Sequence, residues 1–220
     1  MSNAVIIVAG GSGSRMPGDD PKQFALLKGK PLILHSIEAF RKFDPGLQLI
    51  VVMKEDLLSR WKGIVHNHNL NAIVSVPGGQ TRFHSVREGL KVLLKNTNLV
   101  AVHDAARPLV THKIIEIAFE NAETHGAAIP VVPIPESLRE KNGNDSRPVD
   151  RTRFMLVQTP QCFQCELLKQ AYLHDYHPHF TDDASVVEFA GTPVKLCDGD
   201  PINFKITFPG DLQRAEFLMK

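Results

Sequence analysis

A short apolar run near the start of the chain constrains the fold more than any other feature. Residues 4–9 read Ala-Val-Ile-Ile-Val-Ala and lead directly into Gly10-Gly11. Because neighbouring residues along this run are all apolar, we expect a strand that is buried on both faces, as in a parallel sheet. The glycine-rich turn would then lie at the carboxyl end of a strand, where such sheets bind their ligands.

Further apolar runs alternate with segments in which apolar residues have helical spacing. We expect strands near residues 47–53, 72–76, 99–103 and 127–132, and helices near 32–43, 56–68, 82–94 and 111–125. Thr81 is a candidate cap, and Gly126 is a helix stop signal. This alternation predicts an α/β fold with a mostly parallel twisted sheet flanked by helices. A length of 220 residues suits one domain with one large core.

The alternation breaks at Pro133. Residues 136–150 are polar and contain Asn142-Gly143-Asn144-Asp145, which is typical of a hairpin turn. We therefore predict a projecting β-arm at about residues 134–153, and a surface loop is the alternative. Beyond the arm we expect short strands at 154–157, 194–197 and 203–207. A helix capped by Thr181 is expected over 182–190, and a last helix is expected to begin at Pro209.

The balance of charge and the cysteine count exclude several classes of partner. The chain has 25 Lys and Arg residues against 24 Asp and Glu residues, so its net charge is +1. No broad basic field is available for nucleic acid or a membrane surface. No apolar run approaches the roughly 20 residues that span a bilayer. Three cysteines, an odd number, argue against a disulfide framework, so we expect a cytoplasmic protein.

The turn after the first strand is the first candidate site. It carries a cation, Arg15, and Pro21-Lys22-Gln23 supplies a second. The turn lacks the Gly-Lys-Ser/Thr of a Walker A loop, and Met16 stands at the third glycine position of the dinucleotide fingerprint. Two cations beside backbone N–H groups can hold a triphosphate and offset charge on its α-phosphate. A tight loop with two solvated cations is the alternative interpretation.

Two further candidate sites follow later strands. Asp104, after the strand near 99–103, can hold Mg²⁺, and Arg107 can face an anionic substrate. A capping aspartate and a surface arginine are the alternative. After the strand near 72–76, Gly79 allows close backbone approach and Ser85 offers a hydroxyl to a base edge. There the alternative is a turn followed by a helix cap.

Two other features, a pair of cations and a pair of cysteines, carry weaker signals. Arg151 and Lys205 are candidates for orienting a second phosphate, although a lone lysine in a strand is usually solvated. Cys162 and Cys165 form a CxxC pair. No second pair exists, and the histidines at 174, 177 and 179 have no standard zinc-finger spacing. We interpret the cysteines as reduced thiols.

Taken in order, these motifs resemble the 2-C-methyl-D-erythritol 4-phosphate cytidylyltransferase family of the non-mevalonate isoprenoid pathway. The resemblance covers nearly the whole chain, and eight motifs in order at matching separations make it specific. They are residues 9–16, Pro21-Lys22-Gln23, Gly78-Gly79, 103–108, Asp150-Arg151, Thr159-Pro160-Gln161, Thr181-Asp182 and 203–207.

The resemblance implies a Rossmann-like nucleotidyltransferase fold over residues 1–220, in a homodimer whose arm helps to form the partner's site. It implies transfer of CMP from CTP to the erythritol phosphate, with Mg²⁺ as cofactor and release of pyrophosphate. By the same resemblance Arg15 and Lys22 stabilise the transition state, and Arg151 and Lys205 position the acceptor phosphate. The nucleotide contacts implied are Ala9, Gly10, Gly11, Gly13, Gly79, Ser85 and Asp104, with Asp104 also at the metal, and the acceptor contacts are Arg107, Ser137 and Thr181.

The sequence departs from the family pattern at a few positions. Gln80 stands where an aspartate is common, and Ser137 and Arg139 stand where Thr and Lys are common. A ribitol-5-phosphate cytidylyltransferase is the main alternative, and Ala106 favours the erythritol phosphate because the ribitol enzymes tend to carry valine there. A non-catalytic nucleotide-binding regulator would be expected to have lost Arg15, Lys22 or Lys205, and all three are present.

Overall fold

The first strand is buried on both faces, as its sequence predicts. The structure, a computed structural model, describes residues 2–11 and 21–219. Strand β1 (Ser2–Val8) lies between β4 (Gln48–Met53) and β6 (Thr97–Asp104) and is parallel to both. Val5 and Ile7 pack into the core on one side of the sheet and Ile6 into the core on the other. Apolar side chains on both faces are what a central parallel strand requires.

Around β1 the described residues form a mixed eight-stranded sheet in the order β10-β7-β11-β6-β1-β4-β5, with β12 paired to β7. Four pairings are parallel, β1 with β4, β1 with β6, β4 with β5 and β7 with β12, whereas β10 and β11 are antiparallel to their neighbours. The remaining strands of this sheet are β5 (Val74–Pro77), β7 (Ala127–Pro133), β10 (Met155–Val157), β11 (Gln161–Gln164) and β12 (Lys195–Asp198).

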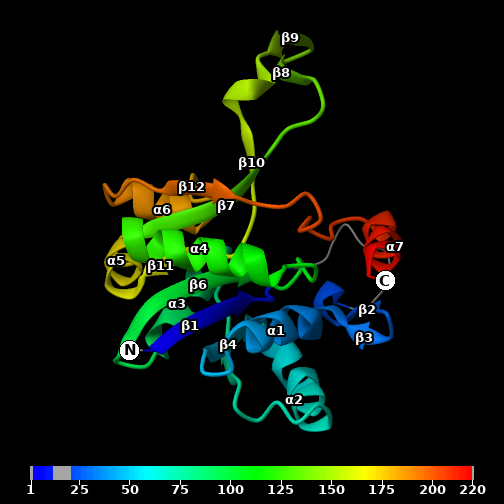
Figure 1. Ribbon diagram of the computed structural model, residues 1–220, viewed down its shortest axis with the longest axis vertical. Helices are drawn as coiled ribbons and strands as arrows, with labels where there is room; N and C mark the ends of the chain where they lie inside the picture. Colours follow the sequence, from blue (N-terminus) through cyan, green and yellow to red (C-terminus); the bar gives the residue numbers. More distant parts are fainter. Residues whose placement is uncertain (1, 12–20, 220) are drawn as a thin grey trace.

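Helices cover both faces of this sheet (Figure 1). On one face lie α1 (Leu32–Phe43), α2 (Leu58–Asn67) and α4 (His112–His125). On the other lie α3 (Arg82–Lys91), α5 (Cys165–Ala171) and α6 (Asp183–Phe189). The last helix, α7 (Pro209–Leu218), packs beside the small pair β2 (Leu26–Leu27) and β3 (Lys30–Pro31). None of the described helices is long and apolar enough to cross a membrane.

The helix boundaries agree with the local sequence signals except at α6 and at the end of α3. Thr81 and Thr111 cap α3 and α4, and α4 ends at Gly126. The predicted cap of α6 was wrong: Asp182, not Thr181, accepts the hydrogen bond from Ser185 N at 3.0 Å, in a capping box. Helix α3 ends at Lys91, a few residues earlier than expected.

One predicted strand is absent, and one observed strand was missed. Residues 203–207 do not form a strand, because they lie along the loop that follows β6. Strand β11 was not expected, and it lies in the middle of the sheet between β6 and β7.

The predicted arm is a two-stranded hairpin of β8 (Leu138–Asn142) and β9 (Asp145–Val149). It projects from the body of the molecule above β10 (Figure 1). Most of its side chains are exposed. The sequence therefore located the hairpin and its turn correctly, and the alternative of an unstructured surface loop is wrong.

Close packing of α3 on the sheet gives a test of the fold. A Cβ atom on Gly89 would lie 2.8 Å from Ile6 Cγ2, and this β-branched side chain in a central strand has little room to move. Alanine is favoured over glycine inside a helix by about 0.5–1 kcal/mol, but overpacking a core costs about 1–3 kcal/mol. Gly89→Ala should therefore lower the free energy of unfolding by about 1 kcal/mol, measured by urea denaturation.

Gly63→Ala is the matched control, because Gly63 is an exposed residue of α2 and its added Cβ meets no atom within 4 Å. It should raise the free energy of unfolding by about 0.5–1 kcal/mol. Stabilisation of similar size by both substitutions would contradict the packing of α3 against β1.

Candidate active site

A cavity of about 310 Å³ opens at the carboxyl ends of β1, β4 and β6. This is the edge of the sheet at which the sequence placed the candidate residues. Its described lining joins the turn after β1, the loop before α3, the end of β6 and the segment near Lys205. The lining residues are Val8, Ala9, Gly10, Gly11, Lys22, Gln23, Lys54, Gly79, Gln80, Thr81, Arg82, Ser85, Asp104, Ala105, Ala106 and Lys205.

The loop before α3 is folded tightly onto its own helix. A Cβ atom on Gly79 would lie 2.3 Å from His84 Cβ, so only glycine fits there. The Ser85 hydroxyl accepts from Gly79 N at 3.2 Å and donates to Thr81 O at 3.0 Å. The backbone of Gly79 and the Ser85 side chain therefore form one rigid wall of the cavity.

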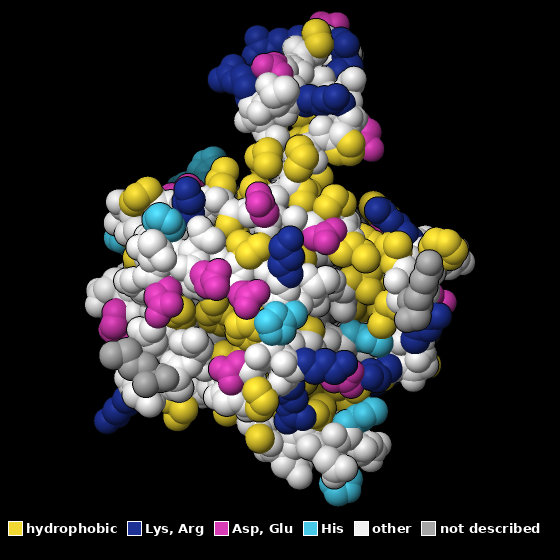
Figure 2. All heavy atoms as spheres, viewed as in Figure 1, with side chains coloured by type: hydrophobic (Ala, Val, Ile, Leu, Met, Phe, Trp, Pro, Cys, Tyr) yellow, Lys and Arg dark blue, Asp and Glu magenta, His cyan; other side chains and the backbone are white. Residues whose placement is uncertain are grey.

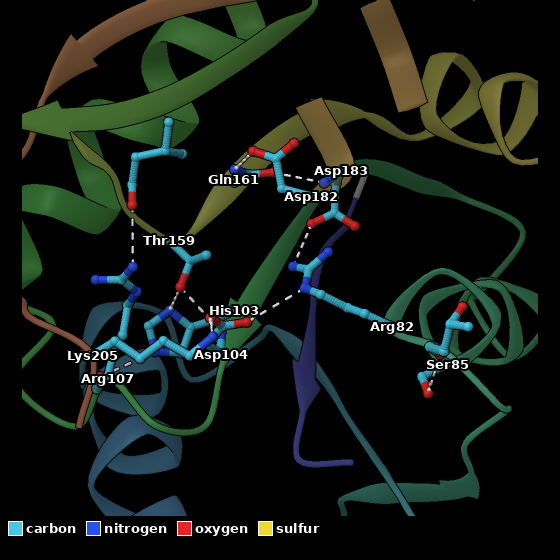
Figure 3. Close-up of polar contacts among 12 residues, drawn as sticks. Arg82, Ser85, His103, Asp104, Arg107, Thr159, Gln161, Asp182, Asp183 and Lys205 are labelled. Atoms are coloured by element: carbon cyan, nitrogen blue, oxygen red, sulfur yellow. Dashed lines mark hydrogen bonds and ion pairs between the residues drawn. The ribbon is translucent and has the colours of Figure 1, made fainter. Parts of the chain in front are cut away.

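Asp104, at the end of β6, lines the cavity, and Figure 3 shows its side chain near those of Arg82 and Lys205. Lys205 Nζ donates to its Oδ2 at 2.7 Å, and Arg82 Nε lies 3.5 Å from its Oδ1. Burial alone would raise the pKa of Asp104, but the positive charges of Arg82 and Lys205 outweigh it and hold the pKa well below its usual range. Asp104 is therefore ionised throughout the neutral range.

A buried relay of hydrogen bonds fixes the backbone of Asp104. Its N–H donates to Thr159 Oγ1 at 3.1 Å, and the Thr159 hydroxyl lies 3.1 Å from His103 Nδ1. His103 Nε2 lies 3.2 Å from Arg107 O, which can only accept, so the proton is on Nε2 and Nδ1 accepts from Thr159. Burial lowers the pKa of His103 to about 4, so the ring is neutral near pH 7. His103 is thus a buried support of the strand end.

Lys22 and Lys205 reach the cavity from distant parts of the chain. Lys22 begins a 3₁₀ helix (Lys22–Phe24), and its Nζ donates to Ile206 O at 2.7 Å. Ile206 N in turn donates to Ala106 O at 2.8 Å. The segment that carries Lys205 is therefore fixed against the loop after Asp104, although it is not the strand that the sequence suggested.

Arg107 does not line the cavity in the part of the chain that the structure describes. Its Nη1 donates to Asn203 O at 2.7 Å and its Nη2 to Val157 O at 3.1 Å. Burial lowers the pKa of this guanidinium. Arg107 therefore fastens two backbone segments together, and its contact with an acceptor stays a prediction.

Three other predicted residues, Ser137, Arg151 and Thr181, are exposed and do not line the cavity of their own chain. Ser137 and Arg151 lie at the base of the projecting hairpin, where Arg151 Nη1 donates to Pro135 O. Thr181 directly precedes the cap of α6. Gly13 and Arg15 lie outside the described residues. The roles of all five stay predictions.

Two cations of the lining, Lys54 and Arg82, were missed in the sequence. Lys54 directly follows β4, and the carboxyl end of a parallel strand was a usable signal for it. Arg82 is the first residue of α3, three residues before Ser85, so both lie on one helix face. That spacing could have placed Arg82 beside the predicted nucleotide contact.

The donor set fits a Mg²⁺ ion that arrives with a nucleotide rather than a resident one. Asp104 is the one carboxylate in the described lining. No group of three or more His, Cys, Asp or Glu side chains in residues 2–11 and 21–219 is placed to hold a metal. Mg²⁺ in phosphate-binding sites is commonly held by one or two carboxylates together with substrate phosphates.

The relay at Asp104 can be tested through Thr159. Thr159→Val removes the hydroxyl and leaves the Asp104 N–H and His103 Nδ1 buried without a partner. The free energy of unfolding should fall by about 1–3 kcal/mol. Thr159→Ser keeps the hydroxyl and should therefore keep most of the wild-type stability. Thr124→Val, which removes an exposed hydroxyl on α4, is the control and should change stability by no more than about 0.5 kcal/mol. Equal effects of the two valine variants in urea denaturation would contradict the relay.

Comparison with known proteins agrees with this arrangement. The family model of 2-C-methyl-D-erythritol 4-phosphate cytidylyltransferase matches residues 3–220. An enzyme of that name from Bacteroides thetaiotaomicron is 49% identical over 220 residues, covering 100% of both chains. One from Porphyromonas gingivalis is 43% identical, covering 97% of this chain and 96% of that one.

Solved structures show the same fold. The crystal structure of 2-C-methyl-D-erythritol 4-phosphate cytidylyltransferase from Thermus thermophilus has a TM-score of 0.78 and 31% identity, covering 100% of this chain and 99% of that chain. That of 4-diphosphocytidyl-2C-methyl-D-erythritol synthase from Anaerococcus prevotii has a TM-score of 0.83 and 25% identity, covering 100% of this chain and 96% of that chain. The chain belongs to the 2-C-methyl-D-erythritol 4-phosphate cytidylyltransferase family.

Proposed function

We propose that the chain transfers CMP from CTP to 2-C-methyl-D-erythritol 4-phosphate and releases pyrophosphate. The observation that carries the proposal is the cavity at the strand ends. Its described lining brings together four cations, Lys22, Lys54, Arg82 and Lys205, around the single carboxylate of Asp104. Such an excess of positive charge suits two phosphate-bearing reactants. Membership of the family supports the identity of the nucleotide and the acceptor.

The proposed reaction is an in-line displacement at phosphorus. An oxygen of the acceptor phosphate forms a bond to the α-phosphorus of CTP, and the bond from that phosphorus to the bridging oxygen breaks. The bonding electrons leave with pyrophosphate. The attacking phosphate is already largely ionised near neutral pH, so the step needs no general base.

The main task of the protein is therefore electrostatic. Two anions must approach each other, and negative charge then grows on the α-phosphate and the leaving group. In the proposal Lys22 and Arg15 stabilise that charge, and Lys205 and Arg151 hold the acceptor phosphate. Loss of one preorganised stabiliser of this kind typically costs about 10²–10³ in rate.

Asp104 is the proposed ligand of Mg²⁺, which would neutralise phosphate charge when bound. Lys205, the proposed ligand of the acceptor phosphate, donates a hydrogen bond to Asp104, the proposed ligand of the metal. This contact supports binding of the acceptor phosphate next to the nucleotide. Ala9, Gly10, Gly11, Gly79 and Ser85 line the same cavity and are the described residues proposed to contact the nucleotide. Gly13 belongs to the same proposed set.

The proposal includes a homodimer in which the hairpin of one chain reaches the site of the other. Strand β10 lies at the edge of the sheet, next to the hairpin, and its side chains are exposed. Phe154 is 46% and Leu156 49% exposed, and Figure 2 shows hydrophobic side chains gathered at the neck of the hairpin. An exposed apolar patch on an edge strand is a surface on which another chain can pack. Ser137 and Arg151 would then contact the acceptor in the partner's cavity, beside Arg107 and Thr181.

The proposed compartment is the cytoplasm. All three cysteines, Cys162, Cys165 and Cys197, are buried free thiols, which suits a reducing environment.

The acceptor can be tested directly by measuring pyrophosphate release from CTP and Mg²⁺. We expect strong release with 2-C-methyl-D-erythritol 4-phosphate and little with D-ribitol 5-phosphate. Release with ribitol phosphate alone would keep the mechanism but overturn the acceptor. Silence with both would contradict the proposed transfer.

The sharing of sites between chains can be tested by mixing two variants after denaturation and refolding. Lys22→Ala alters the cavity, and Arg151→Ala alters the hairpin. Random pairing of equal amounts makes half of the refolded dimers hybrids. If the hairpin completes the partner's site, each hybrid has one site with both residues intact. The mixture should regain about a quarter of wild-type activity. If each hairpin serves its own chain, mixing should restore no activity.

A further inference from the structure

One guanidinium joins two carboxylates, Asp104 and Asp183, that lie far apart in the sequence. Arg82, the first residue of α3, donates from Nη2 to Asp183 Oδ2 at 2.6 Å. Its Nε lies 3.5 Å from Asp104 Oδ1. Figure 3 shows Arg82 between the end of β6 and the first turn of α6. Arg82 therefore connects the cavity to a helix that contributes no described residue to its lining.

The Asp183 end of this bridge is rigid. Asp183 is 0% exposed, and its Oδ1 accepts from the Tyr172 hydroxyl at 2.6 Å. Both carboxylate oxygens therefore have a short hydrogen bond. A buried carboxylate that lost its cation would be strongly destabilised. Arg82 is for this reason held by Asp183 and is not free to turn toward solvent.

The backbone that carries Asp183 is fixed relative to the strand that carries Asp104. The buried amide of Gln161 accepts from the N–H groups of Asp183 and Ala184, both at 3.0 Å. In the pairing of β11 with β6, Gln161 lies opposite Val102, and Val102 is two residues before Asp104. The two carboxylates that Arg82 joins thus belong to one hydrogen-bonded frame.

The two cations at Asp104 differ in how firmly they are held. The Lys205 side chain is 44% exposed, whereas the Arg82 side chain is 25% exposed and is anchored on Asp183. Lysine is a flexible point charge, and arginine is a planar fork that keeps its geometry. If Asp104 gave one oxygen to a metal-bound nucleotide, Lys205 would be the partner able to move, and Arg82 would stay in place.

We propose that Arg82 is a positioning residue, which is anchored on Asp183 and Tyr172 and orients the Asp104 carboxylate toward the metal-bound triphosphate. The inference rests on the proposed function, because that function gives Asp104 its role. A positioning role differs from that of a direct phosphate ligand, because the effect of a direct ligand on binding would not depend on Asp183. It also differs from a purely structural role, because loss of a structural ion pair would change stability but not the Mg²⁺ dependence of binding.

The test measures equilibrium binding of α,β-methylene-CTP across a range of Mg²⁺ concentrations by calorimetry, without turnover. Arg82→Lys keeps a positive charge but cannot span both carboxylates. We expect it to raise the Mg²⁺ concentration for half-maximal binding by about 10- to 100-fold, the usual effect of losing a group that orients a metal ligand. Asp183→Asn should act in the same direction. Tyr172→Phe, the mildest change, should give a smaller shift of the same sign.

Arg87→Lys is the matched control, because Arg87 is on the same helix but lies over the Phe83 ring and does not line the described cavity. It should leave the Mg²⁺ dependence unchanged. Thermal unfolding of every variant shows which ones are folded. If Asp183→Asn does not fold, Arg82→Lys and Tyr172→Phe still decide the matter.

Three results separate the possibilities. Weaker binding in Arg82→Lys with wild-type binding in folded Tyr172→Phe and Asp183→Asn would overturn the inference in favour of a direct contact. An unchanged Mg²⁺ midpoint in Arg82→Lys would overturn it as well. If wild-type protein bound the analogue, and the variants shifted as expected, but no CMP were transferred to the erythritol phosphate, the proposed function would fail and the positioning role would stand.

Discussion

The rest of the site depends on keeping the mostly buried carboxylate of Asp104 ionised at the edge of the sheet. Burial favours the protonated acid, so the charge survives only because Arg82 and Lys205 lie on its two oxygens. The backbone of the same residue is fixed by Thr159. Each of these partners needs its own support, and the supports reach well beyond the cavity. Asp183 holds Arg82, and Asp183 is itself held by Tyr172 and Gln161.

Many of those supports meet in one short segment, residues 158–164, which crosses the middle of the sheet antiparallel to its neighbours. Thr159 contacts the strand end through Asp104 N, and Gln161 binds the first turn of α6. Asn203 donates to Thr159 O at 2.9 Å, so the segment that carries Lys205 is attached to it too. Strand β11 lies between β6 and β7, and its first residue, Gln161, pairs with Val102 near the carboxyl end of β6. The segment that leads into β11 therefore lies beside Asp104, α6 and the segment that carries Lys205.

The parts of the fold that were predictable are those governed by local patterns. The apolar run of β1, the spacing in α1 and the turn of the hairpin each identify their element without help from distant residues. Strand β11 could not be found in this way, because Gln161-Cys162-Phe163-Gln164 is short and begins and ends with amides; its burial comes from its neighbours. At α6 a local signal was present but misread, since Ser185 completes a capping box with Asp182 and not with Thr181.

The candidate site shows the same division. Ala9 and Gly79 follow parallel strands and Asp104 ends one, so topology alone brings them to one cavity. The ion pair between Arg82 and Asp183 joins residues 101 positions apart, and no local pattern indicates it. This ion pair also affects the electrostatics of the cavity. The cations that line the cavity repel one another, and the carboxylates of Asp104 and Asp183 reduce that repulsion through their ion pairs with Arg82 and Lys205. Under the proposed function, binding of a phosphate would exchange one anionic partner of Lys205 for another, while Asp183 would keep Arg82 in place.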